Sequence, residues 1–145
     1  MIEYALETNV RIDWSDLDSL GHVNNLAIMR YMQTVTVLYL EKLGLLPNNK
    51  TLEVGPIMAS VSGQFKKQIH YPGDVRVIST VNELRTTSFH IKHHVIDEKN
   101  DIAAEGHNII VIFDFKKNVK HAIPADLREK IEKMESAHKT FNIRK

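Results

Sequence analysis

The spacing of hydrophobic positions changes from two residues to three and four residues near position 26. Residues 4–12 alternate apolar or β-branched side chains with polar ones, which predicts a half-buried strand. Over residues 26–43 apolar side chains recur at helical spacing, and no charged residue occurs in 33–40. This second segment is therefore predicted to be a long helix that is buried on most of its sides.

Beyond the helix the pattern is mostly that of strands. The loop 47–50 leads into strands predicted near 56–70, 74–84, 88–97 and 102–115, with turns at 71–74, 85–87 and 98–101. Pro124 opens a polar C-terminal helix that reaches about His138, and the basic tail after it is expected to fray.

This order of elements predicts an α+β fold: one strand, one buried helix, then an antiparallel meander. Short connections favour antiparallel neighbours, and the sheet is the only good packing partner for the apolar helix. We therefore expect a curved antiparallel sheet wrapped around a central helix, with a short C-terminal helix. The length of 145 residues is typical of one domain spanning 1–145.

Composition excludes several classes of function. The net charge of +1 gives no broad basic face for nucleic acid. The chain has no cysteine, so disulfides, thiolate metal sites and a thiol nucleophile are excluded. No signal peptide is expected at the N-terminus, and no apolar stretch approaches the ~20 residues that span a bilayer. A soluble cytoplasmic protein without membrane or nucleic-acid partners is expected.

Candidate chemistry is concentrated in residues 16–25, Asp-Leu-Asp-Ser-Leu-Gly-His-Val-Asn-Asn, directly before the predicted helix. Asn24 or Asn25 suits the N-cap of that helix, and Gly44 suits the position after its end. The first N–H groups of a helix have no internal partner, and the helix dipole adds positive potential there. A nearby aspartate could then act on a reactive carbon whose oxygen points at those donors, giving an acyl-transfer site without serine or cysteine.

The motif of residues 16–25 resembles that of the hotdog-fold acyl-CoA thioesterases, most closely the 4-hydroxybenzoyl-CoA thioesterase-like branch. The resemblance covers nearly the whole chain and includes residues 68–74, the turn 85–89 and Ala122-Ile123-Pro124. It implies a hotdog fold and hydrolysis of an acyl-CoA to a free acid and coenzyme A, with no cofactor and no metal.

Residue by residue, the resemblance makes Asp18 the catalytic aspartate and the backbone N–H of Asn25 the donor that polarises the thioester carbonyl. Arg85 matches a basic position used toward the phosphates of coenzyme A, although Thr86 and Thr87 stand where close relatives can carry basic residues. Asp18 could attack the thioester or activate water. The pattern alone also fits a turn or helix-capping aspartate at this position.

Further substrate contacts are expected from His22, Asn24 and Ser88. His22 could order the loop, contact the acyl group or position water, and it could equally be a structural histidine. Ser88 is a turn hydroxyl or a contact near the pantetheine arm. Asp16 is expected to shape the loop or to hold a backbone group rather than to react, and a metal site from Asp16, Asp18 and His22 is disfavoured.

Other polar clusters have simpler explanations. His90 and His94 share one strand face with Lys92, which argues against a metal and predicts an exposed polar face. Lys66 and Lys67 could line a phosphate path, but ordinary solvated charge is the simpler expectation.

The expected partners are an acyl-CoA substrate and further copies of the chain. Free strand edges favour pairing of two chains across a two-fold axis. The resemblance implies a homodimer or homotetramer with sites at the subunit interface, so that Asp18 of one chain meets Arg85 or Ser88 of a neighbour. Three alternatives stay open: an acyl-carrier-protein thioesterase, a hydratase, which lacks its expected Gly-Asp-x-Asn-Pro-type loop here, and a non-catalytic acyl-CoA-binding domain. The acyl group itself cannot be read from the sequence.

Overall fold

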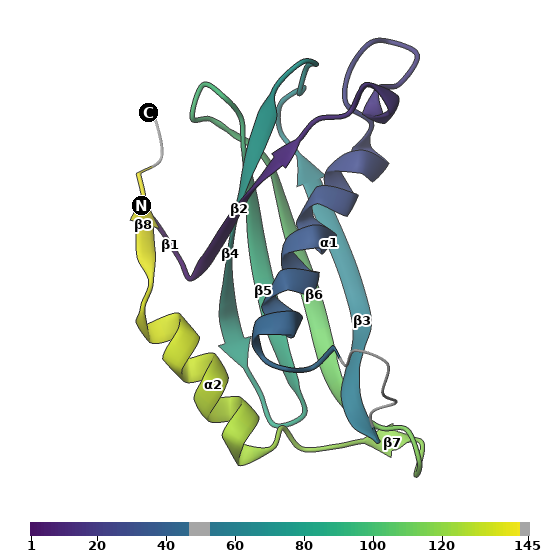
Figure 1. Cartoon of the computed structure of the whole chain (residues 1–145), viewed down its shortest axis with the longest axis vertical. Helices are drawn as coiled ribbons and strands as arrows, with labels where there is room; N and C mark the ends of the chain where they lie inside the picture. Colours follow the sequence, from purple (N-terminus) through teal and green to yellow (C-terminus); the bar gives the residue numbers. More distant parts are fainter. Residues whose placement is uncertain (47–52, 143–145) are drawn as a thin grey trace.

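The computed structural model describes residues 1–46 and 53–142 as an antiparallel sheet with one long helix across a face (Figure 1). Its elements are β1 (Ile2–Tyr4), β2 (Leu6–Arg11), a 3-10 turn η1 (Trp14–Asp16), α1 (Asn25–Lys42), β3 (Val54–Phe65), β4 (Asp74–Leu84), β5 (Ser88–Ile96), β6 (Ile102–Asp114), β7 (Val119–Lys120), α2 (Ala125–Ser136) and β8 (Lys139–Phe141). The predicted loop 47–50 lies outside the described residues.

The main sheet has the strand order β2-β4-β5-β6-β3, with β7 added to β6. The predicted meander is correct for β4, β5 and β6, but β3 pairs with β6 at the far edge instead of with β4. Strand β3 also ends at Phe65 rather than near 70, because the N–H groups of Lys66 and Lys67 both turn to the carbonyl of Ala103. The segment after it then crosses to the other edge, where β4 pairs with β2.

Helix α1 has the predicted boundaries and capping residues. The side chain of Asn24 accepts a hydrogen bond from the N–H of Leu26 at 2.8 Å. At the other end Gly44 adopts φ +74°, and Leu45 N–H bonds to Leu40 O, which closes a Schellman motif. The helix lies close to β3 and β6 because Gly63 and Gly106 leave room for Met29 and Met32. The buried side of α1 is made by Ala27, Ile28, Tyr31, Met32, Val35, Thr36, Tyr39 and Leu40.

The expectation that α1 is buried on most sides is wrong for the single chain. Gln33, Thr34 and Glu41 are exposed on the side away from the sheet, and Leu26 is 78% exposed in the first turn. A single sheet can cover only one side of a helix, and no described element lies over the other side (Figure 1).

The prediction that the tail after the C-terminal helix frays is wrong for residues 139–141, and residues 143–145 lie outside the described part of the chain. Residues 139–141 do not fray but form β8, which pairs with β1 and packs Phe141 against Tyr4, Ile78 and Ile96. The first predicted strand is accordingly divided at Ala5, whose N–H bonds to Ser79 O while β1 leaves the main sheet.

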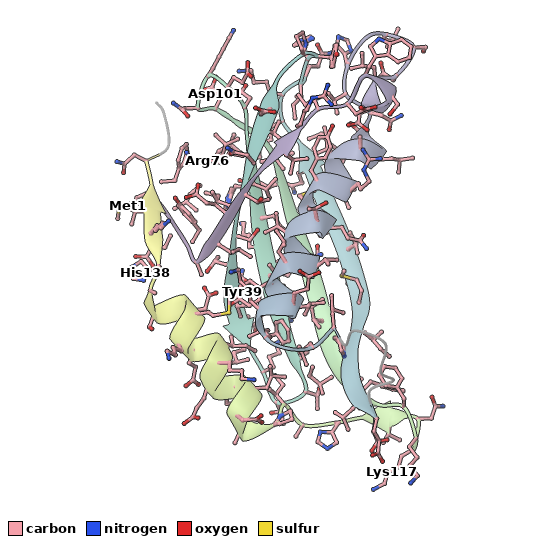
Figure 2. All side chains as sticks on the ribbon, in the orientation of Figure 1. Met1, Tyr39, Arg76, Asp101, Lys117 and His138 are labelled. Atoms are coloured by element: carbon pink, nitrogen blue, oxygen red, sulfur yellow. The ribbon has the colours of Figure 1, made fainter. Side chains whose placement is uncertain are left out.

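Helix α2 joins the core where α1 meets β4. Its apolar residues Leu127 and Ile131 pack in the cluster that contains Tyr39. The hydroxyl of Tyr39 donates to the carboxylate of Glu135, which also accepts from Thr80 on β4. Figure 2 shows Tyr39 at this junction of α1, α2 and β4.

The prediction of an exposed histidine face on β5 is also wrong. His90 and His94 do share a face, but each is only 7% exposed, and they pair with Glu83 and Glu105 respectively. On the opposite face His93 is fully buried, with Nδ1 2.5 Å from Ser79 Oγ and Nε2 2.9 Å from Thr36 Oγ1. Burial, reinforced by the charges of nearby histidines, lowers the pKa of His93 to about 3, so this ring is neutral.

No helix in the described part of the chain is long and apolar enough to cross a membrane.

Candidate active site

The motif loop is a closed turn between η1 and α1. Leu17 and Val23 form an antiparallel bridge, and inside it the N–H of Asp18 donates to His22 O at 2.8 Å. Gly21 donates to Asp18 O and adopts φ +82°, a conformation that side chains other than glycine rarely take. The loop geometry therefore depends on glycine at this position.

Asp18 is half-buried at the centre of this turn. Its Oδ1 accepts hydrogen bonds from Leu20 N–H at 2.9 Å and from His22 N–H at 3.1 Å. No described residue donates to Oδ2. The structure thus places Asp18 in the turn role that the sequence left open, while one carboxylate oxygen remains available for chemistry.

Asp16 anchors the loop to α1. Its carboxylate is 4% exposed and accepts hydrogen bonds from Asp13 N–H at 3.0 Å, from Tyr31 Oη at 2.6 Å and from Arg30. Burial alone would raise the pKa of Asp16, but the bonds from Tyr31, Arg30 and Asp13 outweigh it and leave the pKa below its usual value. The prediction that Asp16 holds a backbone group is confirmed. Arg30 and Tyr31 were missed because their link to Asp16 depends on tertiary packing.

The start of α1 follows the loop without a break. Asn24 N–H donates to Asp16 O at 2.8 Å, so the anchored aspartate also fixes the N-cap residue. Asn25 is exposed, and no described residue accepts from its backbone N–H. The helix therefore begins with a donor that can bind a substrate oxygen, next to the turn that holds Asp18.

His22 pairs with a residue that the sequence did not single out as a contact. His22 and His70 form an isolated β-bridge, and their rings meet edge to face with centroids 5.2 Å apart. His70 also lines a hollow of about 500 Å³, together with Ile69 and Gly73, whereas His22 does not line it. Asp18 and Asn25 do not line it. The motif loop is thus tied to the segment between β3 and β4.

The turn between β4 and β5 lies at the opposite end of the sheet from the loop that precedes α1 (Figure 1), and it carries Arg85 and Ser88. Strand β4 runs from Asp74, near the loop, to Leu84 beside Arg85, a length of about 33 Å. One chain therefore does not bring Arg85 and Ser88 to Asp18. In this chain the guanidinium of Arg85 pairs with Glu83 at 2.8 Å, and the backbone N–H of Arg85 donates to Ser88 O.

The two lysines considered for a phosphate path are paired with carboxylates. Lys66 lies 3.2 Å from Glu105, and Lys67 lies 2.7 Å from both Asp97 and Asp101. Lys67 therefore ties the segment after β3 to the turn between β5 and β6. Among the described residues, no group of three histidine or acidic side chains is arranged to hold a metal ion.

Comparison with known proteins decides the family. Residues 12–131 match the model of the thioesterase-like superfamily, which is most of the chain and includes the motif loop. The chain belongs to this superfamily. This match confirms the prediction that the protein is a thioester hydrolase. No curated protein sequence matches the chain significantly.

Several solved structures of other proteins have the same fold as this chain. The PA2801 protein of Pseudomonas aeruginosa, a candidate thioesterase, is 25% identical with a TM-score of 0.78, over 88% of this chain and 98% of that one. The gentisyl-coenzyme A thioesterase BH1999 is 23% identical with a TM-score of 0.74, over 87% and 99%. SAV2348 of Staphylococcus aureus, solved in complex with CoA, is 11% identical with a TM-score of 0.85, over 94% and 87%. The α+β hotdog fold is thereby confirmed.

Proposed function

We propose that this protein is an acyl-CoA thioesterase in which Asp18 is the catalytic carboxylate and Asn25 N–H the oxyanion donor. The observation that carries the proposal is the Asp18 carboxylate, held by two backbone N–H groups in a turn that leads to Asn25, whose own N–H donates to no described residue. Such donors stabilise the negative charge that develops on a thioester oxygen. The CoA bound to SAV2348 supports coenzyme A as the carrier of the acyl group.

The Asp18 carboxylate can perform the chemistry in two ways. As a nucleophile it attacks the thioester carbonyl, expels the thiolate of coenzyme A and forms a mixed anhydride, which water then hydrolyses to the free acid. As a general base it takes a proton from water while that water attacks the same carbonyl, and the proton passes to the leaving thiolate. Both routes need an ionised Asp18 and a donor for the carbonyl oxygen.

The proposed active site is completed by a second chain. Arg85 and Ser88 lie about 33 Å along β4 from the motif loop, so a neighbour must supply them if they contact the same substrate. Strand β3 offers the edge for such an assembly. It is the last strand of the sheet, is 12 residues long, and exposes Val61 and Phe65 by 47% and 40%. Long, apolar edges of this kind favour pairing with another strand.

Thiol release from a panel of short, long and aromatic acyl-CoAs tests the activity. We expect turnover of at least one of them by the native protein, and turnover at least about 10²-fold lower by Asp18→Asn. Tight binding without release would instead show an acyl-CoA-binding domain. Release only from acyl carrier protein thioesters would assign the other carrier.

Mixing an Asp18 variant with an Arg85 variant tests the shared site. If Asp18 and Arg85 act in one site from different chains, a mixture of Asp18→Asn and Arg85→Ala chains contains some sites with both native residues. These sites have the native KM, so at acyl-CoA concentrations below KM the mixture should turn over more substrate than the two variants assayed separately. No gain after subunit exchange would show that the two residues do not share a site.

A further inference from the structure

The face of the sheet that points away from α1 carries a polar hollow. It measures about 390 Å³ and is lined by residues of β3, β4, β5 and β6. The side chains in it are those of Ser62, Gln64, Asn82, Lys92, Glu105 and His107. Lys92 points away from α1 because the next residue, His93, points inward and contacts Thr36 of that helix. Helix α1 covers the other face, in front of the sheet in Figure 1.

A β-bulge in β4 brings one of these side chains to the hollow. The register between β4 and β5 shifts between Val81 and Glu83, so Asn82 is an extra residue in β4. Val81 packs against the hydrophobic core, whereas Asn82 lines the hollow and Glu83 pairs with His90 on the same face. Bulges redirect side chains in this way and are over-represented next to active sites. The bulge therefore adds an amide to the polar face.

The two carboxylates beside the hollow are already paired. Each is shared between a permanent cation and a histidine: Glu105 with Lys66 and His94, and Glu83 with Arg85 and His90. Lys92 lies between His90 and His94 on β5, is half-buried, and pairs with no carboxylate of the described residues. The chain itself therefore leaves the ammonium of Lys92 without a counter-ion, at a place where solvent screens its charge only in part.

The histidine across the hollow experiences the same excess of positive charge. His107 lies opposite Lys92 in the register of β5 and β6, and its ring meets that of His90 edge to face with centroids 5.1 Å apart. Partial burial lowers the pKa of His107, and the charges of His90 and Lys92 lower it further, whereas Glu83 on β4 raises it. The two β3 side chains of the hollow carry no charge. An anion between Lys92 and His107 would relieve this repulsion and favour the charged form of His107.

We propose that this hollow binds a small molecule that carries a phosphate group, with Lys92 and His107 as its charged contacts. A volume of about 390 Å³ is within the usual range for small-molecule sites. The amide groups of Asn82 and Gln64 supply further donors. A phosphate ester has three acceptor oxygens and nearly two negative charges, so it uses this set of donors more fully than a carboxylate does.

The proposed ligand is a molecule other than the acyl-CoA substrate. No residue of the motif loop lines the hollow, and neither do Arg85 and Ser88, the residues expected to contact coenzyme A. The proposal therefore does not rest on the thioesterase activity, and its main test is made without substrate.

Calorimetric titration of the native protein with inorganic phosphate and with glycerol 3-phosphate tests the site. We expect saturable binding of both, and none of glycerol or acetate. Lys92→Gln should weaken the binding at least about tenfold, as loss of a hydrogen bond to a charged group does, and Asn82→Ala should weaken it several-fold. Lys130→Gln, the same change of charge at an exposed position of α2, should leave it unchanged. No binding to the native protein, native affinity in Lys92→Gln, or equal binding of acetate would overturn the proposal.

Proton NMR of the histidine rings tests the second charged contact, with His107→Gln to assign the resonance. Glycerol 3-phosphate should raise the pKa of His107 and leave that of the exposed His138, which lies 3.5 Å from Glu3, unchanged. In Lys92→Gln without ligand the pKa of His107 should also rise, because the ammonium that lowers it is gone; this rise shows that the variant is folded. A pKa of His107 that does not respond to phosphate would overturn the proposal.

Competition distinguishes this ligand from coenzyme A. Coenzyme A should not displace glycerol 3-phosphate in the calorimeter, and Lys92→Gln should leave KM for an acyl-CoA unchanged. Displacement by coenzyme A, or a raised KM, would place the hollow in the substrate site and overturn the proposal of a separate one. Absence of thioesterase activity would refute the proposed function but would leave the calorimetric result intact.

Discussion

Removing the hydroxyl of Tyr31 tests whether Asp16 holds the motif loop in place. Tyr31 Oη donates to Asp16 Oδ2 at 2.6 Å, and both residues are at least 96% buried. Tyr31→Phe keeps the ring in the core but leaves a buried carboxylate short of one donor. Loss of a hydrogen bond to a charged group costs about 1.5–3 kcal/mol.

That cost should be measurable as both stability and pH dependence. For a chain of this size it corresponds to a fall in the melting temperature of roughly 3–12 °C. In the native protein the lowered pKa of Asp16 stabilises the fold above the unfolded-state pKa of 3.8, and this contribution is lost as pH falls through the folded-state value. Tyr31→Phe should raise that folded-state pKa, so acid unfolding should begin at higher pH.

Tyr4→Phe is the matched control, because Tyr4 is 6% exposed and its hydroxyl makes a long 3.4 Å contact to Glu7. Its melting temperature should change by no more than ~2 °C, because a contact this long contributes little to stability. Turnover should fall in Tyr31→Phe and not in Tyr4→Phe. Equal stability and turnover of the two variants would refute the role assigned to Asp16.

Three further predictions follow from other parts of the structure. The pKa of His93 is about 3 in the folded protein and near 6.5 in the unfolded chain, so the unfolded chain gains a proton at this residue as pH falls below 6.5. The free energy of unfolding should therefore be about 2 kcal/mol lower at pH 5 than at pH 8 because of His93, and urea titrations of His93→Gln should lack this dependence on pH. Arg85→Ala should raise KM for an acyl-CoA several-fold without lowering kcat. It should leave KM unchanged for the acyl-pantetheine with the same acyl group, because that substrate lacks the nucleotide phosphates. An equal rise in KM for both substrates would contradict phosphate binding by Arg85. Gly106→Ala should cost about 1–3 kcal/mol of unfolding free energy because its Cβ would meet Met32, and an unchanged urea midpoint would contradict the close packing of α1 on β6.

Local patterns predicted the elements whose cause is local. The strand predicted over 74–84 and the helical spacing over 26–43 match β4 and α1 closely, and the capping residues Asn24 and Gly44 act as predicted. The position of β3 beside β6 could not be predicted in this way, because it depends on which strand edges meet in the folded sheet. The same holds for β8, which is short and polar and forms only because β1 is present to pair with it.

The candidate site likewise has a part that the sequence predicted and a part that depends on tertiary packing. The sequence located the loop that contains Asp18, His22, Asn24 and Asn25, because these residues are contiguous and end at a helix start. It could not reveal that Tyr31, fifteen positions beyond Asp16, is a donor to that carboxylate. It also gave no sign that His94 is buried, since exposure of a sheet face is decided by what packs on it.

The most direct test of the central claim is kcat of Asp18→Asn on the best acyl-CoA substrate, together with its affinity for that substrate. The asparagine Oδ1 can still accept from Leu20 and His22 N–H, so the turn is kept and only the reactive carboxylate is lost. Asp13→Asn is the control, because Asp13 likewise accepts from a backbone N–H, that of Ser15. We predict that Asp18→Asn loses at least about 10²-fold in kcat, comparable to loss of an oxyanion donor, with near-native affinity, while Asp13→Asn keeps its activity. A folded Asp18→Asn protein with native turnover would contradict the account.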